Sequence, residues 1–260
     1  MKTIAAVVAG LVVACRCEAG IILTGTAYSQ TFDSLGTGLP GGWGVYTDAG
    51  SSSLGTVGTF TSAKSYWSAS SAGFYNVASA NGLTASATTA AQNNSVDRAL
   101  GIRQAGTPSG YDPGAAVVLE IQSTTGFKDF TLSFKALMLD VNPRSTTWTF
   151  DYRVGGSGSF TSLGTYSDPA EWGPTPVTFT PTDLASWNDQ ASSVFFRVLA
   201  LSGSSESGTR DMIGIDDVSL SFVPVPEPVL SGWLAAGGLL AIAGFRSWRR
   251  GRSHRASPRA

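Results

Sequence analysis

Apolar and polar side chains alternate in several short stretches of this 260-residue chain, most regularly over residues 147–154 and 130–136. A period of two places the apolar side chains on one face of an extended strand, so both stretches predict half-buried antiparallel strands. About ten strands joined by polar loops favour an all-β fold of two packed antiparallel sheets, a sandwich of the jelly-roll type. Less regular apolar runs predict the other strands, at residues 28–32, 58–62, 73–78, 100–103, 115–122, 177–180, 194–201 and 213–222.

The last predicted strand changes phase within its own length. Its apolar residues keep one parity up to Ile215 and the opposite parity from Val218 onward. An extra residue near Asp216 and Asp217, a β-bulge, would return both halves to one buried face. The sequence therefore predicts a bulge at this point.

Two stretches, 51–61 and 79–95, contain few large apolar residues and are rich in Ser, Thr, Gly and Ala. They predict long loops or weak edge strands. The one helical candidate is a turn near residues 182–187, which Thr182 or Asp183 would cap. The chain shows no convincing internal repeat, which argues against solenoids and propellers.

The N-terminus has the pattern of a secretory signal. A basic start and an apolar run over residues 3–14 precede small residues at Cys17 and Ala19, the positions that signal peptidase recognises. The sequence therefore predicts a signal peptide over residues 1–19, with export through the Sec machinery. The four residues that end at Cys15 also resemble a loose bacterial lipobox, so lipidation of Cys15 stays open as a second route.

The opposite end combines an apolar segment with a basic tail. The uncharged residues 229–245 would form a helix about 25 Å long, near the lower limit for spanning a bilayer. Trp233 and Trp248 lie near its two ends, where aromatic rings favour the headgroup layer. Arginines crowd residues 246–260, and the positive-inside rule keeps such a cluster in the cytoplasm. These features predict one transmembrane helix.

A Pro-Glu-Pro motif, formed by Pro226, Glu227 and Pro228, stands immediately before this helix. Its prolines remove two backbone donors and fix φ, so the segment stays extended. Motif, helix and basic tail together resemble the PEP-CTERM sorting signal of Gram-negative bacteria. The resemblance implies that an exosortase processes the chain near this motif at the inner membrane, before it reaches the envelope or extracellular matrix. The tail begins with Arg246, Arg249 and Arg250.

The predicted domains are the signal over residues 1–19, an exported domain over 20–223 and the sorting signal over 224–260. The whole chain has a net charge of -1. The exported domain alone has nine basic and sixteen acidic residues, a net charge of -7. Such an acidic domain argues against nucleic acid and anionic lipid as partners, and is compatible with divalent cations or neutral polysaccharide.

The composition of the exported domain excludes several kinds of catalytic site. The single histidine, His254, lies in the basic tail, and both cysteines lie in the predicted signal peptide. Ser-His-Asp and Cys-His catalysis and ordinary zinc sites are therefore excluded. No glycine-rich phosphate loop and no G-x-S-x-G elbow occurs. Carboxylate chemistry remains, so a glycosidase or lyase stays an alternative, with no carboxylate pair singled out.

Aspartates near the ends of the first and last predicted strands suggest a structural calcium ion. Asp33 follows the first strand, whereas Asp216 and Asp217 lie in the last. These two strands often neighbour each other in such sandwiches, so hard oxygen ligands from both would bind Ca²⁺, with Asp211 as a further ligand. The competing interpretation is that each aspartate bonds the backbone of its own turn.

Two tryptophans are candidates for sugar stacking, as in carbohydrate-binding modules. Trp43 lies within LPGGWG and Trp172 within AEWGP, both predicted to be loops in which the indole would be exposed. The competing interpretation is that each indole covers an edge of the core. The stretches FDSLGTGLPGGW and IDDVSLSF also look like the beginning and the end of jelly-roll modules on secreted bacterial proteins.

The sequence as a whole predicts an exported, non-enzymatic protein of the Gram-negative cell envelope or biofilm matrix, sorted by a PEP-CTERM signal. One alternative is a carbohydrate-binding module that attaches to exopolysaccharide. The other is a carboxylate-dependent glycosidase or lyase. The expected partners are the Sec machinery, an exosortase-type membrane protease or transpeptidase, the inner membrane and, for the first alternative, polysaccharide.

Overall fold

The structure is a computed structural model that describes residues 20–106, 110–144, 146–167, 171–204 and 208–226. The chain divides into two compact units, 1–224 and 225–260, and all the described helices and strands lie in the first. The predicted signal peptide and the predicted helix 229–245 lie outside the described residues. Within the described ranges, no helix is long and apolar enough to cross a bilayer.

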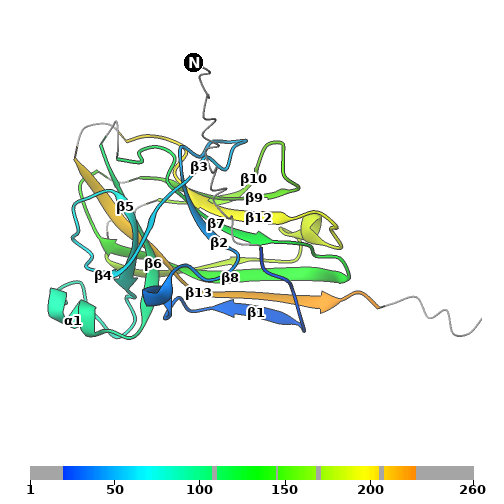
Figure 1. Cartoon of the computed structure of the whole chain (residues 1–260), viewed down its shortest axis with the longest axis horizontal. Coiled ribbons are helices and arrows are strands. Elements are labelled where there is room, and N and C mark those ends of the chain that lie inside the picture. Colours follow the sequence, from blue (N-terminus) through cyan, green and yellow to red (C-terminus); the bar gives the residue numbers. More distant parts are fainter. Residues whose placement is uncertain (1–19, 107–109, 145, 168–170, 205–207, 227–260) are drawn as a thin grey trace, which may run out of the picture. The chain divides into compact units, whose positions relative to one another are not determined.

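Two β-sheets, packed face to face, make up the described part of the first unit (Figure 1). Its seven-stranded sheet has the order β11-β8-β13-β6-β5-β4, with β1 also paired to β13. Its six-stranded sheet has the order β10-β9-β12-β7-β2-β3. The strands of the seven-stranded sheet are β1 (Ala27–Gln30), β4 (Phe60–Ser65), β5 (Gly73–Ala78), β6 (Arg98–Ala105), β8 (Phe127–Asp140), β11 (Gly173–Phe179) and β13 (Thr209–Pro224). Those of the six-stranded sheet are β2 (Trp43–Thr47), β3 (Thr56–Val57), β7 (Ala116–Ile121), β9 (Trp148–Val154), β10 (Thr161–Tyr166) and β12 (Val194–Leu199).

Helical structure in the described residues is confined to short pieces. The hydroxyl of Thr88 caps α1 by accepting the amide of Ala91 at 3.2 Å. The prediction of loop or weak strand over residues 79–95 missed this helix. The predicted turn near 182–187 is confirmed, but its predicted cap is wrong, because the N-cap residue is Leu184 and no side chain caps the turn. The pieces are α1 (Thr89–Asn94) and the 3-10 turns η1 (Leu35–Thr37) and η2 (Ala185–Trp187).

The all-β, two-sheet sandwich predicted from the sequence is confirmed, and the jelly-roll classification stays a prediction. The first and last strands are neighbours, with Ala27 of β1 opposite Ser221 of β13 (Figure 1). The expectation of purely antiparallel sheets is wrong at one edge, because β4 runs parallel to β5. Parallel pairing there follows from the connection between them, which crosses from one end of the sheet to the other instead of turning back as a hairpin.

The predicted bulge in the last strand is confirmed. The register of β13 against β8 shifts between Asp216 and Ser219, and Asp217 has a φ of 49°. On its other edge, β13 pairs with β6 up to Ile215 and with β1 from Val218. The bulge therefore lies where the strand changes partner, and it returns both apolar halves to the core.

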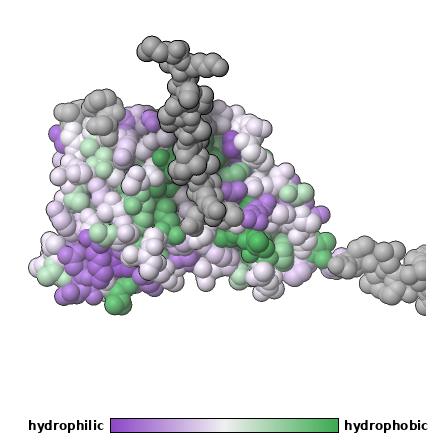
Figure 2. All heavy atoms as spheres, viewed as in Figure 1, coloured by the Kyte–Doolittle hydropathy of each residue, from purple (hydrophilic) through white to green (hydrophobic). Residues whose placement is uncertain are grey.

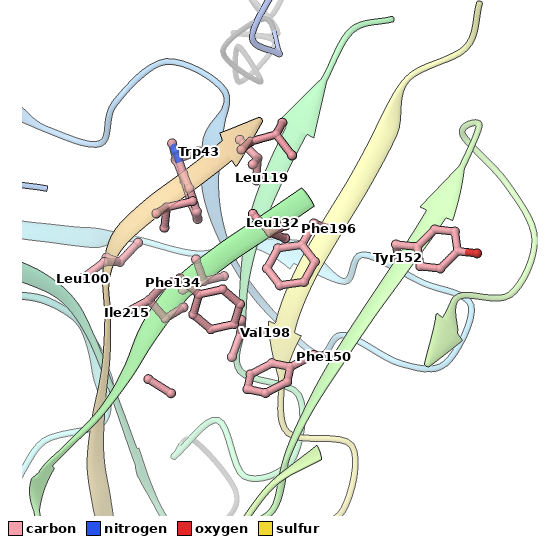
Figure 3. Packing of buried hydrophobic residues seen from close by; sticks show 14 of the residues in the cluster. Trp43, Leu100, Leu119, Leu132, Phe134, Phe150, Tyr152, Phe196, Val198 and Ile215 are labelled. Atoms are coloured by element: carbon pink, nitrogen blue, oxygen red, sulfur yellow. The ribbon is translucent and has the colours of Figure 1, made fainter. Parts of the chain in front are cut away.

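The main core fills the space between the two sheets. Phe134 of β8 and Phe150 of β9 meet edge to face, with ring centroids 5.3 Å apart (Figure 3). Phe196 of β12 lies 5.7 Å from the ring of Phe134. Burial of each such side chain stabilises the fold by about 1.5–3 kcal/mol, so this aromatic contact is a main link between the sheets.

The outward faces of both sheets are also partly buried. On the seven-stranded sheet, Leu137, Leu139 and Met212 pack against Trp67, which the segment after β4 supplies. On the six-stranded sheet, the outward residues of β7 and β12 pack under Leu54 and Phe160. The expectation that β9 exposes one polar face is therefore wrong: its outward Asp151 and Arg153 are 3% and 6% exposed.

Candidate functional site

A surface groove of about 370 Å³ lies between η1, β2, β3 and β4, and it reaches the end of β7. This volume lies within the range of about 300–1,000 Å³ that is usual for small-ligand pockets. β2 belongs to the six-stranded sheet and β4 to the seven-stranded sheet, so the groove lies at an edge of the sandwich. Figure 2 shows hydrophobic side chains reaching the surface on the face that carries β2, β3 and β4.

Aromatic side chains form part of the groove wall. Phe60 of β4 is half-buried, whereas Tyr46 and Trp43 of β2 are 8% and 4% exposed. Phe60 therefore offers the most accessible ring of the three. Val57 of β3, 53% exposed, and Val118 of β7 continue the apolar surface on either side.

Glycines shape the groove. Four of the residues that line it are glycines, and two of them, Gly38 and Gly42, have a positive φ at which any other residue would be strained. Gly42 has a φ of 79°, and a Cβ there would lie 2.5 Å from Cγ2 of Ile21. A Cβ at Gly44 would lie 3.0 Å from the ring of Tyr46. The glycines thus permit close chain packing beside the groove.

Polar atoms line the same groove. Thr37 and Ser62 contribute hydroxyls, and Glu120 is the only charged residue among the described residues that line it. Glu120 lies near the end of β7 and is partly exposed, and its Oε1 accepts a hydrogen bond from Oγ of Ser193 at 3.1 Å.

The structure corrects the interpretation of Trp43. This residue begins β2 and is 4% exposed, so it is neither in a loop nor open to solvent. Its indole packs edge to face on Phe32, with ring centroids 4.8 Å apart, and its Nε1 donates to the hydroxyl of Tyr28 at 2.8 Å. Figure 3 shows Trp43 among the core side chains. The competing interpretation, a tryptophan at the edge of the core, is the one that the structure supports.

Trp172 lies outside the groove and away from Trp43 in the fold. It precedes β11 and packs half-buried against Trp67, with ring centroids 5.3 Å apart. It belongs to the cluster on the outward face of the seven-stranded sheet and does not line the groove. The two tryptophans predicted to bind sugar therefore do not share one open surface.

The aspartates proposed for calcium are each bonded within the protein. Asp33 accepts the amide of Arg98 at 2.9 Å, and Asp211 accepts the amide of Asn142 at 2.5 Å. Asp217 forms an ion pair of 2.6 Å with Nζ of Lys135. In the described part of the chain, no group of three or more Asp, Glu, His or Cys side chains is arranged to hold a metal. The residues present do not fit the predicted calcium site.

Asp216 is the most perturbed of these carboxyl groups. It is fully buried, accepts a hydrogen bond from the hydroxyl of Ser79 at 2.5 Å and accepts the amide of Asp217 at 2.7 Å. Burial raises its pKa to about 7, although these two hydrogen bonds act in the opposite direction. The nearby charges of Asp217 and Asp97 contribute to this rise in the pKa. Lys135 supplies the positive charge at this cluster by its contact with Asp217.

The residues of the predicted sorting motif are almost all outside the described ranges. Pro226 is exposed and follows the end of β13. Glu227, Pro228, Arg246, Arg249 and Arg250 lie beyond the described residues. The sorting signal therefore stays a prediction from the sequence.

Comparison with known proteins finds likeness to solved structures alone. No family model matches the chain, and no curated protein is similar to it. A xylan-binding module, CBM15, is 12% identical, with 78% of this chain and 100% of that chain covered and a TM-score of 0.42. The K3 adhesin domain of Lys-gingipain from Porphyromonas gingivalis W83 is 14% identical, covering 75% of this chain and 97% of that chain, with a TM-score of 0.41. A Stig cyclase, Fisc from Fischerella sp. TAU, is 15% identical, covering 76% and 90%, with a TM-score of 0.39. The names of these three proteins describe three different functions.

Proposed function

We propose that this protein is a non-enzymatic, carbohydrate-binding β-sandwich that holds a polysaccharide in the groove between η1, β2, β3 and β4. The observation that carries the proposal is the lining of that groove. Apolar surface from Phe60 and Val57 adjoins the hydroxyls of Thr37 and Ser62 and the carboxylate of Glu120. A sugar ring has the same division, with an apolar C–H face and hydroxyls at its edge. The ring of Phe60 offers a surface on which such a face can stack.

The proposal of binding without cleavage rests on the carboxylates of the groove. Glycoside hydrolysis ordinarily uses two carboxyl groups, about 5–9.5 Å apart, one on each side of the bond to be broken. Among the described residues that line the groove, Glu120 is the one carboxylate. This arrangement supports a binding site better than it supports the alternative of a carboxylate-dependent glycosidase or lyase.

The test is a polysaccharide array probed with the purified protein and two matched variants. Phe60→Ala removes the accessible ring and should weaken binding about tenfold, because stacking and apolar burial are both lost. Phe127→Ala is the control, since Phe127 is also half-buried against the main core but packs on Phe222, outside the groove. Its affinity should stay within twofold of the wild type. Failure to retain any polysaccharide, or equal losses in the two variants, would contradict the proposal.

We also propose that the chain is exported and held at the inner membrane of a Gram-negative bacterium until an exosortase acts on it. The sequence of residues 226–260 supports this proposal. A tagged chain should sediment with membranes and then appear in the envelope or matrix. Replacing Pro226, Glu227 and Pro228 with alanine should leave it unprocessed in the membrane fraction. A tagged wild-type chain that accumulates in the cytosol would overturn this proposal.

A further inference from the structure

A lysine, an asparagine and an aspartate from three separate segments meet at the bulge of β13. Lys135 belongs to β8, Asp217 lies in the bulge, and Asn81 lies in the turn that follows β5. Nζ of Lys135 lies 2.6 Å from Oδ2 of Asp217 and donates to Oδ1 of Asn81 at 3.0 Å. The same Oδ2 accepts Nδ2 of Asn81 at 3.5 Å, near the long limit for a hydrogen bond. One carboxylate oxygen therefore contacts both the lysine amine and the asparagine amide nitrogen.

The groups around Asn81 fix the orientation of its amide. Nδ2 donates to the carboxylates of Asp97, at 3.0 Å, and Asp217, and ionised carboxylates only accept. Oδ1 accepts from the ammonium of Lys135, which only donates. The reversed amide would place donor against donor and acceptor against acceptor. Because a C=O bond is about 1.2 Å long, the 3.0 Å contact with Oδ1 places Nζ at most about 4.2 Å from Cγ.

This arrangement holds a nucleophile beside an electrophile. A lysine amine that has lost a proton is a nucleophile, and the carbon of a carboxamide is an electrophile. Reacting atoms need an approach of about 3–3.5 Å, so a movement of about 1 Å brings Nζ to Cγ. Holding both groups in one fold also removes much of the entropic barrier to a reaction that free amines and amides undergo very slowly.

We propose that Lys135 and Asn81 join through an amide bond between Nζ and Cγ, with Asp217 as the proton carrier, so that the sandwich is covalently cross-linked. The Nζ–Cγ bond forms and the Cγ–Nδ2 bond breaks. Nζ gives up two protons, and Nδ2 takes up two and leaves as ammonium. Asp217 contacts both nitrogen atoms and passes each proton from one to the other. The reaction needs no oxidant and no second substrate.

The charges around Lys135 set the pH at which the bond forms. The hydrogen bond to Asp217 raises the pKa of Lys135, burial opposes this rise, and the charges of Asp217, Asp216 and Asp97 add to it. At neutral pH the lysine is therefore an ammonium, and the bond forms slowly. The free amine becomes more abundant as the pH rises toward the lysine pKa, so the rate increases with pH. The side chains of Lys135 and Asp217 are 34% and 37% exposed, so ammonium escapes to solvent.

The bond connects parts of the sheet that are not neighbours. In the seven-stranded sheet, β13 and β6 lie between β8 and β5, and the bond joins β8 to the segment that follows β5. It closes a covalent ring over residues 81–135, which restricts the unfolded chain as a disulfide does. Residues 20–223 contain no cysteine, so the bond provides a covalent staple that their composition does not otherwise allow.

The experiment is a tryptic peptide map of the purified protein by mass spectrometry, before and after incubation at about pH 9. Trypsin cuts after Lys and Arg, so the unlinked chain gives Asn81 in peptide 65–98 and Lys135 at the end of peptide 129–135. We expect peptide 65–98 joined to peptide 129–144, uncut after Lys135 and lighter than their sum by one ammonia. The joined species should increase during the incubation.

Three variants give the expected contrasts. Lys135→Arg keeps a cation beside Asp217 but replaces the nucleophile, so it should give separate peptides. Lys128→Arg makes the same change at a lysine of β8 that is paired with Asp129 instead, and it should cross-link as the wild type does. Asp217→Asn removes the proton carrier and should slow the reaction about 100-fold. Asparagine tolerates the φ of 49° at this position better than most residues.

An ammonia can also be lost within the turn, because Gly82 follows Asn81 and its amide nitrogen can attack Cγ to form a succinimide. That change stays within peptide 65–98 and leaves the cut after Lys135 intact. Such a result, or unmodified separate peptides in the wild type after incubation, would overturn the inference. A cross-link that forms equally fast in Asp217→Asn would overturn the role of Asp217. If a variant does not fold, the map of the wild type decides the outcome.

Discussion

The outward faces of the two sheets are both partly buried, but different segments of the chain cover them. On the seven-stranded sheet, the segment after β4 lays Trp67 over Leu137 and Met212 and buries them. On the six-stranded sheet, Leu54 and Phe160 pack over outward residues of β7 and β12, but β2 also borders an open groove. The difference teaches that segments cover the outward face of each sheet, whereas the groove lies at an edge of the sandwich, between β2 of one sheet and β4 of the other.

Each of these faces holds a buried carboxyl group. The direct partner of one is a charged guanidinium, and the direct partners of the other are neutral. Asp151, on the six-stranded sheet, is paired with Arg197, whose guanidinium also lies 3.2 Å from the ring centroid of Phe160. Asp216, on the seven-stranded sheet, has a hydroxyl and an amide as its direct partners in the described structure. Burial raises the pKa of both carboxyl groups, and at Asp151 the guanidinium opposes that rise.

The largest effect is expected from removing the cation of the paired site. Arg197→Met leaves Asp151 buried without its partner and also frees the carbonyls of Gly50 and Ser53, which Arg197 bonds at 3.1 and 2.8 Å. The free energy of unfolding should fall by about 3–5 kcal/mol, as measured by urea denaturation. The double variant Arg197→Met with Asp151→Leu should recover part of the loss, because it also removes the buried charge. If Arg197→Met is as stable as the wild type, Arg197 does not stabilise the buried Asp151, and the contrast between the two carboxyl groups is wrong.

A smaller and pH-dependent effect is expected at Asp216. Its pKa is raised from 3.8 in the unfolded chain to about 7 in the folded one. Its contribution to stability is therefore complete below the unfolded pKa and is lost as the pH rises through about 7. The loss amounts to at most about 4 kcal/mol. Asp216→Asn keeps an acceptor for the amide of Asp217 without the charge, so it should be the more stable protein at pH 8.

Denaturation curves at pH 4, 6 and 8 check this prediction. The stability of the wild type should fall relative to that of Asp216→Asn as the pH rises, and the two should converge at pH 4. Asp97, Asp217 and Lys135 face the same cluster and are unchanged in both proteins, so their titration is common to the pair. A constant difference in stability between the two proteins at all three pH values would show that folding does not raise the pKa of Asp216.

Much of the fold could be predicted from alternation alone. Strands in the second half are long and regular, and the change of parity after Ile215 located the bulge. The β2 strand was missed because its sequence, with Gly42 and Gly44 beside Trp43, resembles a loop. Those glycines are present because Ile21 and Tyr46 occupy the space of a side chain, which only the folded structure reveals.

The site was harder to predict than the fold. Tryptophan in a glycine-rich stretch indicated exposure, yet Trp43 is buried and Phe60, within a short predicted strand, is the accessible ring. Glu120 sits in an apolar run that predicts only a buried strand. Their meeting depends on how β2, β4 and η1 converge from distant parts of the chain, and no local pattern carries that information.

The most direct test of the central claim is an NMR titration of the purified protein with a neutral oligosaccharide. We predict that amide shifts concentrate at the groove, at Gly38, Gly44 and Phe60, and leave Trp172 unchanged. Shifts centred on Trp172 and Trp67, or no shifts with any neutral oligosaccharide that spans several sugar units, would contradict the account.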